Sequence, residues 1–417
     1  MISERFLQAR PKPMKYQEMI NLSTLLLKNG HLIKGTGEEP LCNTDLLIEE
    51  GIIKEIKPTG LIPFNQYHTV DIANMTVMPG LINCHVHVTL EPVGDPFSLL
   101  NNENRTKAAL RAAVNVKKHL QSGVTYLRDM GGYDNIDLEV KSCVEEGFIP
   151  GPGMQVSGKA LTMTGGHGHR FGRECDGEDD ARKAAREQLK AGADIIKLMA
   201  TGGVLTPGVE PGSPQLTIKE MAAAIEEAHK AGRKTAAHAQ GTVGIKNALI
   251  AGIDSIEHGI FLDDETIEMM IAQNTYFVPT LVAPYFIIKY GPEGGAPEYA
   301  IEKSKRVEEF HTKSFIKALK AGVKIAMGTD SGTPFNLHDG TVQELLLMVK
   351  YGMKPLEVIT AATKTAAELL GIDNDYGTLE EGKFADLIVL AENPLTDMQT
   401  MLDIKYVYKK GVNVNGQ

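Results

Sequence analysis

Short apolar runs broken by turn residues fill the chain from residue 24 to residue 78. The run LLLKNGHLI carries Asn29-Gly30 at its centre, and LLIEEGIIKEI carries the tripeptide Glu-Glu-Gly between two strand-like stretches. Both patterns predict β-hairpins, because such residues favour the tight turns that join neighbouring strands. The same pattern returns after residue 376, in GTLEEGKFADLIVL and IKYVYKKGVNVNG. We therefore predict one small β-rich domain assembled from both ends of the chain, residues 24–78 and 376–417.

Between these ends, strand-like apolar runs alternate with longer amphipathic segments. Helical periodicity is clear in ENRTKAALRAAVNVKKHLQSG and in TIKEMAAAIEEAHKAG, which begins with a capping-box pattern of Thr217 and Glu220 and ends at Gly232. Eight alternations over residues 79–375 predict an α/β fold of the (β/α)8 TIM-barrel type rather than an open doubly wound sheet. The expected strands are, in order, LINCHVHV, VTYLRD, MQVSGK, DIIKLMA, KTAAHA, DSIEHG, TYFVPT and KIAMGT.

Composition narrows the possible partners and the cellular setting. The 417 residues are 42% hydrophobic and 23% charged, and the net charge of −10 argues against a nucleic-acid partner. No run approaches the roughly 18 apolar residues of a membrane span, and the N-terminus lacks the apolar core of a secretory signal. The four cysteines are widely spaced without a CxxC pattern, which predicts a reducing, cytoplasmic setting. Residues 1–23 are expected to form an N-terminal extension.

In such a barrel, reactive side chains project from the carboxyl ends of the strands. His85 and His87 end the first strand, and because strand side chains alternate, both imidazoles are expected on the same interior face. Two nitrogen donors on one face form a metal clamp, although a hydrogen-bonded pair of core histidines would have the same pattern. The other groups at this mouth are Lys197 in the fourth strand, His238 ending the fifth, His258 ending the sixth and Asp330 following the eighth.

Lys197 lies among apolar residues in DIIKLM, with no evident counter-charge beside it in the sequence. Burial of an ammonium group there is costly and would lower its pKa. Three alternatives avoid that cost: a Schiff base with a carbonyl substrate, an ion pair with a carboxylate, or a carbamate formed with CO₂. Taken alone, the lysine leaves all three open, and the structural ion pair is the simplest.

The combination of these six groups favours catalysis over a structural role. We expect two divalent ions, one held by His85, His87 and Asp330, the other by His238 and His258, with carbamylated Lys197 as the bridge. Such a pair lowers the pKa of a shared water to about 7 and polarises a carbonyl oxygen, which suits hydrolysis of an amide or ester. Asp330 would then accept the proton of the bridging hydroxide and deliver it to the leaving nitrogen.

The chain resembles the amidohydrolase superfamily in five segments, which are, in order, PGLINCHVHV, IIKLMATGGV, AAHAQG, IEHG and GTDSG. The resemblance covers nearly everything from about residue 24 onward and implies a small β-sandwich built from both termini. Within the superfamily, TGGHG and KLMATGG are most similar to the binuclear-zinc branch of Xaa-Pro dipeptidases and arginine carboxypeptidases, which also resembles imidazolonepropionases and ochratoxin-hydrolysing amidases. By this resemblance the six groups are ligands of two Zn²⁺ ions, and Lys197 is the N6-carboxylated bridge.

The resemblance implies cleavage of a C–N amide bond in a small molecule such as a dipeptide or an N-acyl amino acid. His167, in the loop TGGHGHRFG, is the predicted donor to a substrate carbonyl or carboxylate, the alternative being a role in ordering the loop. Gln240 is the second predicted substrate-binding residue. It stands where some peptidases of this branch carry a tyrosine that helps to hold a terminal carboxylate, which weakens the expectation of a carboxylate substrate.

Other functions fit parts of the pattern. A cyclic-amide hydrolase or deaminase of the imidazolonepropionase type would hold one metal and lack the bridging lysine, a Schiff-base lyase would act through Lys197, and a non-catalytic barrel would have lost ligands.

Two segments are expected around the site. ATGGVLTPGVEPGSPQL is typical of a lid, and the insertion APYFIIKYGPEGGAPEYA would line a pocket or join the subunits of a homo-oligomer through Tyr285, Phe286, Tyr290 and Tyr299.

Overall fold

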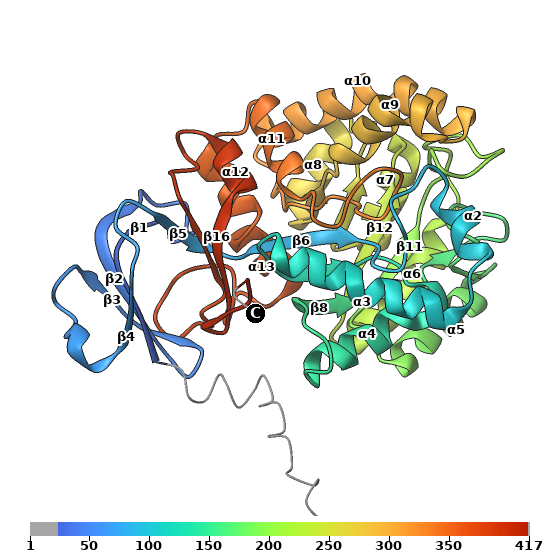
Figure 1. Ribbon diagram of the computed structural model, residues 1–417. Coiled ribbons are helices and arrows are strands. Elements are labelled where there is room, and N and C mark those ends of the chain that lie inside the picture. Colours follow the sequence, from blue (N-terminus) through green and yellow to red (C-terminus); the bar gives the residue numbers. More distant parts are fainter. Residues whose placement is uncertain (1–23, 416–417) are drawn as a thin grey trace, which may run out of the picture.

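Strands from both ends of the chain meet in one eight-stranded sheet. The computed structural model describes residues 24–415, so the predicted extension 1–23 lies outside the described residues. The strand order is β17-β16-β15-β5-β1-β2-β3, with β4 paired to β1 (Figure 1). The strands are β1 (Thr24–Leu32), β2 (Leu41–Glu49), β3 (Ile52–Pro58), β4 (His68–Asp71), β5 (Thr76–Pro79), β15 (Leu387–Leu390), β16 (Ile404–Lys409) and β17 (Val412–Asn413).

Of the two predicted N-terminal hairpins, the structure forms one. Strands β2 and β3 pair antiparallel around the turn at Glu50-Gly51, where both residues have positive φ. The hairpin prediction at Asn29-Gly30 is wrong, because β1 runs through both residues. Asn29 adopts a φ of 66°, and its backbone N–H donates to Asp45 Oδ1 at 2.9 Å, so the irregularity forms a bulge inside one strand instead of a turn between two.

Parallel strands form the middle of the chain, in a sheet of three with the order β6-β7-β8 and a sheet of six with the order β10-β9-β11-β12-β13-β14. Their bounds are β6 (Leu81–Val86), β7 (Val124–Asp129), β8 (Gly153–Val156), β9 (Leu161–Thr162), β10 (Arg173–Glu174), β11 (Ile195–Met199), β12 (Lys234–Ala239), β13 (Ser255–His258) and β14 (Tyr276–Val278). Seven of the eight predicted strand segments of the barrel thus contain a strand. The fold is a mixed α/β fold with parallel sheets.

The eighth predicted strand, KIAMGT, makes only isolated parallel bridges in the structure. Ile325 bridges to Phe277 within β14, and Ser331, two residues beyond the segment, bridges to Val86 at the end of β6. Close packing accompanies this irregular path, since a Cβ added at Gly328 would lie 2.5 Å from a methyl carbon of Val278. The segment nevertheless contacts the ends of β6 and β14 and carries Asp330 between them.

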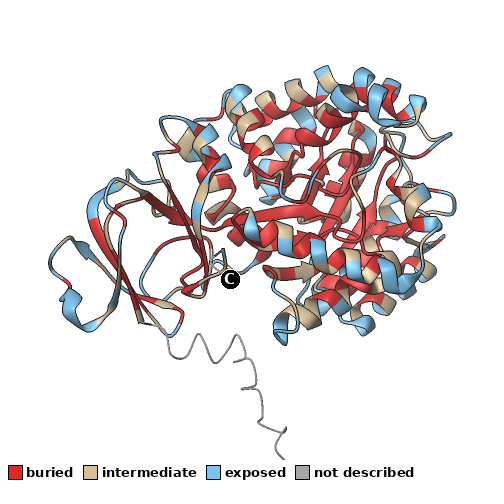
Figure 2. Cartoon of the chain, in the orientation of Figure 1, coloured by how far each residue is buried: buried red, intermediate tan, exposed pale blue. Residues whose placement is uncertain are grey.

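Helices cover the parallel strands, whose residues are almost all buried, while the outer helix faces are exposed (Figure 2). The capping box at Thr217 and Glu220 is confirmed at the start of α6. Within residues 24–415, no helix has both the length and the apolar character that a membrane crossing needs. The α-helices are α2 (Pro96–Asn101), α3 (Arg105–Gln121), α4 (Ile136–Glu145), α5 (Glu178–Ala191), α6 (Ile218–Lys230), α7 (Thr242–Ala251), α8 (Asp264–Gln273), α9 (Val282–Gly294), α10 (Glu298–Ala321), α11 (Val342–Lys350), α12 (Pro355–Ala361) and α13 (Lys364–Leu370), with short 3₁₀ turns at Phe64–Gln66, Tyr133–Asn135 and Met398–Leu402.

A buried carboxyl group of α11 holds the start of α9. Glu344 is fully buried, and its two oxygens accept the backbone N–H groups of Leu281 at 2.9 Å and Val282 at 2.8 Å. We expect Glu344→Ala to lower the free energy of unfolding by about 2–4 kcal/mol, because it leaves two buried donors unpaired and opens a cavity. Chemical denaturation measures this, with the exposed Glu268→Ala on α8 as the control. An unchanged unfolding midpoint for Glu344→Ala would show that the contact does not stabilise the fold.

Candidate metal and substrate site

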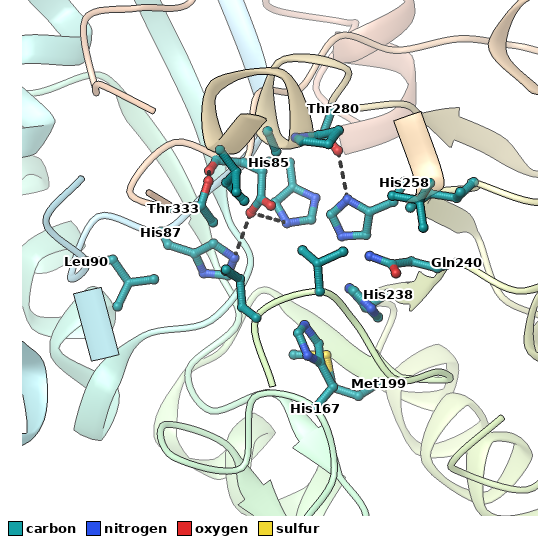
Figure 3. Close-up of a pocket in the computed structure, with 18 of the residues that line it drawn as sticks. His85, His87, Leu90, His167, Met199, His238, Gln240, His258, Thr280 and Thr333 are labelled. Carbon is teal, nitrogen blue, oxygen red and sulfur yellow. Dashed lines mark hydrogen bonds and ion pairs between the residues drawn. The ribbon is translucent and has the colours of Figure 1, made fainter. Parts of the chain in front are cut away.

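The carboxyl ends of the parallel strands surround a cavity of about 700 Å³, counting the part open to solvent (Figure 3). The structure places all eight side chains that the sequence analysis assigned to the site along its walls: His85, His87, His167, Lys197, His238, Gln240, His258 and Asp330. They come from β6, β11, β12 and β13 and from the segments that follow strands. The assembly of these groups is therefore a property of the fold, whereas the role of each one is still a prediction.

Asp330 lies against the two histidines of the first parallel strand. Its Oδ1 is 3.3 Å from His85 Nε2 and 3.2 Å from His87 Nε2 (Figure 3). The other ring nitrogen of each histidine faces an acceptor, since His85 Nδ1 is 2.8 Å from Glu257 Oε2 and His87 Nδ1 is 3.1 Å from the carbonyl of Gly131. A neutral imidazole that donates through Nδ1 has a lone pair on Nε2. When both rings are neutral, three acceptor atoms converge here, and a cation or a proton between them relieves their repulsion.

The protonation preferences of the imidazoles agree with a cation site. Burial lowers the pKa of His85, His238 and His258 well below the ordinary value, and nearby histidines and Lys197 lower it further. These rings are therefore neutral and can act as metal ligands. Burial also opposes protonation of His87, but the hydrogen bond and the charge of Asp330 outweigh it and raise the pKa of His87. The His87–Asp330 pair attracts positive charge.

The two remaining histidines are each anchored through one ring nitrogen. His258 Nδ1 is 2.7 Å from Thr280 Oγ1, and His238 Nε2 is 3.4 Å from the carbonyl of Gly202. The second nitrogen of each ring is left available, and the ring centroids of the two histidines are 4.6 Å apart. One ligand atom each from His85, His258 and Asp330 lies within 4.8 Å of the others. Clustered imidazole and carboxylate groups are the donors that divalent transition metals prefer, so these residues fit such an ion.

Lys197 is 1% exposed, and none of the described residues lies within hydrogen-bonding or ion-pairing distance of its amino group. Burial lowers its pKa to about 8, although the charges of Glu257 and Asp330 act in the opposite direction. The direct ion pair, which was the simplest reading of the sequence, is therefore not formed. With a pKa of about 8, about a tenth of the amine is neutral at pH 7, far more than for an ordinary lysine, and both a Schiff base and a carbamate require the neutral form.

Three residues of the site have a left-handed backbone. The φ angles are 71° at His258, 51° at Thr280 and 62° at Asp330. This conformation is unfavourable for side-chain-bearing residues, and most of all for a β-branched threonine. The surrounding packing therefore holds these residues in place, and the strained positions coincide with the groups that converge on the cavity.

The predicted substrate-binding residues line the cavity beside the histidine cluster. The His167 ring packs on His238 with centroids 4.1 Å apart, and its Nδ1 is 2.9 Å from Thr206 Oγ1. Burial, followed by the charge of Lys197, lowers the pKa of His167 to about 3, so it is a neutral hydrogen-bonding group. Gln240 is 5% exposed, and its Oε1 has no hydrogen-bond partner among the described residues.

Apolar side chains form most of the remaining wall, and the predicted lid contributes to it through Val204 and Leu205. Lys303 of α10 holds the lid by donating to the carbonyl of Thr206 at 2.8 Å. The aromatic residues of the insertion belong to α9 and α10, and Tyr285, Phe286, Tyr290 and Tyr299 are not among the residues that line this cavity. The apolar lining residues are Leu90, Phe97, Phe171, Met199, Val204, Leu205, Ile260, Ala283, Pro284, Ile287 and Val307.

The groups that hold the histidines were not predicted from the sequence. Thr280 anchors His258, and Glu257 anchors His85 from a fully buried position next to Arg128. A signal for Glu257 and Arg128 was present, because a glutamate and an arginine stand inside two predicted strand segments, DSIEHG and VTYLRD. Opposite charges inside two buried strands of the same core indicate an ion pair.

Comparisons with known proteins agree with this geometry. The amidohydrolase family model matches residues 76–414. An ochratoxinase of Aspergillus niger is 33% identical over 97% of this chain and 89% of the relative. Among solved structures, a Xaa-Pro dipeptidase with bound methionine in its active site aligns with a TM-score of 0.87 at 31% identity, covering 94% of this chain and 99% of that one. The A. niger ochratoxinase structure aligns with a TM-score of 0.83 at 31% identity, over 94% and 95%.

Proposed function

The chain belongs to the amidohydrolase family and is a hydrolase of C–N bonds, and from this premise we propose that it cleaves an amide in a dipeptide or an N-acyl amino acid. The relatives named ochratoxinase and Xaa-Pro dipeptidase support these two substrate classes. The observation that carries the proposal is the convergence of His85 Nε2, His87 Nε2 and Asp330 Oδ1 beside a buried lysine that has no partner among residues 24–415.

In this proposal, two Zn²⁺ ions occupy the site. His85, His87 and Asp330 would hold one, His238 and His258 the other, and carboxylated Lys197 would bridge them. When bound, the ions activate water for attack and polarise the scissile carbonyl. Lys197 is suited to carboxylation because its neutral amine can form a bond to the carbon of CO₂ while losing a proton, which gives an anionic oxygen ligand.

The chain's own residues would bind the substrate and transfer a proton from the attacking water to the leaving nitrogen. Asp330 accepts a proton from the attacking water and donates it to the leaving nitrogen, as its position between the imidazoles allows. His167 donates to a carbonyl or carboxylate oxygen of the substrate, and Gln240 offers a neutral amide to a polar group. The apolar wall, with Leu205 from the lid and Ile287 from α9, receives an apolar side chain and excludes water.

The proposal extends to the architecture and the setting of the protein. Residues 79–375 would close into a (β/α)8 barrel, and residues 24–78 and 376–417 would form the β-sandwich domain beside it. We further propose a cytoplasmic homo-oligomer that acts on a small molecule, without a nucleic-acid or membrane partner.

A substrate panel with metal analysis of the same sample tests the proposed function. Purified protein is offered dipeptides, including Xaa-Pro, and N-acyl amino acids with apolar side chains, and the release of free amine is measured. We expect hydrolysis of at least one class, about two zinc ions per chain, loss of activity after chelation and recovery on adding Zn²⁺. Hydrolysis that is indifferent to chelation, or a metal-loaded protein that cleaves no member of the panel, would overturn the proposal.

A further inference from the structure

A charged cluster lies fully buried directly behind His85. Arg128 of β7 is 1% exposed, and Ser255 and Glu257 of β13 are 0% exposed. The Arg128 Nε donates to the carbonyl of Cys84 at 2.6 Å, immediately before His85 on β6. The cluster therefore connects β6, β7 and β13 at the level of the predicted metal ligands.

The two carboxylate oxygens of Glu257 have different partners, one within this cluster and the other in the site. Oε1 accepts from Arg128 Nη2 at 2.8 Å and from the Ser255 hydroxyl at 2.6 Å. Oε2 is 2.8 Å from His85 Nδ1. Because Arg128 balances its charge, Glu257 faces His85 as an acceptor, and the imidazole must carry its proton on Nδ1 to satisfy it.

We infer that Glu257, held in place by Arg128, is a positioning residue that sets the tautomer and orientation of His85, so that the Nε2 lone pair is directed at a divalent ion. The inference rests on the proposed function for the presence of the ion. A carboxylate behind a metal-bound histidine both orients the ring and increases its basicity as a ligand.

The energetics of buried ion pairs favour a functional role for this cluster over a purely stabilising one. A buried ion pair is rarely more stabilising than apolar side chains of the same volume, because the desolvation of two charges offsets their attraction. The other three imidazoles are anchored by uncharged groups, namely the carbonyls of Gly131 and Gly202 and the hydroxyl of Thr280. Among the four clustered histidines, His85 thus has a carboxylate as the partner of its Nδ1, the arrangement that orients a ligating ring and increases its basicity.

Two variants test the inference, each with two measurements. Glu257→Gln keeps the shape but can donate to Nδ1, and Glu257→Asp keeps the charge opposite Arg128 but shortens the reach to His85. The tautomer of His85 is observed by ¹⁵N NMR of the full-length, metal-free chain, and Zn²⁺ affinity is measured by competition with a chromogenic chelator. Glu344→Gln is the matched control, because it alters an equally buried acidic side chain, which accepts from the backbone of Leu281 and Val282 and touches none of the predicted ligands.

We expect the parent and Glu344→Gln to show His85 protonated on Nδ1. Glu257→Gln should shift the proton toward Nε2 and weaken Zn²⁺ binding by about 10–100-fold, and Glu257→Asp should change both in the same direction by less. A parent His85 protonated on Nε2 would overturn the inference, as would a folded Glu257→Gln or Glu257→Asp protein with unchanged tautomer and affinity. Since neither measurement depends on hydrolysis, an inactive parent contradicts the proposed substrate without deciding the role of Glu257.

Discussion

Replacing Lys197 with alanine is expected to remove most of the bound metal and to lower kcat/KM by about 10³-fold or more, since the ions supply several kcal/mol of transition-state stabilisation. The reason is that Lys197 is proposed to become the anionic bridge, and alanine provides no ligand. Acetate or propionate fits the space left by the lysine side chain and should restore part of the metal content and rate. Metal analysis and initial rates, each with and without added carboxylic acid, measure this outcome.

Lys197→Arg is the matched variant, because it keeps a cation and most of the side-chain volume but cannot form a carbamate. We expect it to be as inactive as Lys197→Ala and to show no recovery with added acids, since the guanidinium group fills the space. If Lys197→Ala retained the parent's metal content and rate, the carbamate bridge would be excluded. Borohydride inactivation in the presence of substrate would instead indicate a Schiff base at Lys197.

Asp330→Asn is expected to bind substrate with a near-normal KM and to lower kcat by about 10²–10⁴-fold, the usual contribution of a general acid–base group. The amide keeps the shape of the side chain but cannot carry the proton from water to the leaving nitrogen. Steady-state kinetics on the best substrate of the panel separates kcat from KM, and metal analysis of the same sample shows whether coordination is also weakened.

The exposed Asp339→Asn, nine residues further along the chain, is the control for this variant and should behave as the parent. An unchanged kcat for Asp330→Asn would remove the aspartate from proton transfer. A loss of metal in parallel with kcat would indicate that its main contribution is as a ligand.

Much of the fold was predictable because strands and helices have different hydrophobic periods. The strand patterns containing His85, Lys197, His238 and His258 coincide with strands β6, β11, β12 and β13. The hairpin prediction at Asn29-Gly30 is wrong for a physical reason, because an asparagine with a left-handed backbone occurs in bulges as well as in turns. Here the hydrogen bond from Asn29 to the side chain of Asp45 favours the bulge. That contact joins residues far apart in sequence, and a local pattern does not contain it.

The residues that form the site were predictable from the sequence, but the hydrogen bonds that hold them in place were not. Alternation along DSIEHG places Glu257 and His258 on opposite faces of a strand, so a carboxylate that reaches the same site as His258 was not expected. The left-handed backbone at His258 interrupts this alternation at the strand end, which allows neighbouring residues to serve one centre. The anchors of the histidines depend on distances between strands, and these follow from the folded geometry rather than from the spacing of residue types.

The shared sheet of the two chain ends has a consequence for biosynthesis. Strand β5 pairs with β15, with Pro79 opposite Leu387, so an inner edge of the sheet lacks its neighbour until residues 387–390 have been synthesised. While the ribosome adds the intervening segment, β5 presents unpaired backbone groups, and contacts between such distant residues form slowly. Premature termination before residue 387 would leave that edge permanently open, and such fragments would be expected to aggregate instead of accumulating as a folded hydrolase.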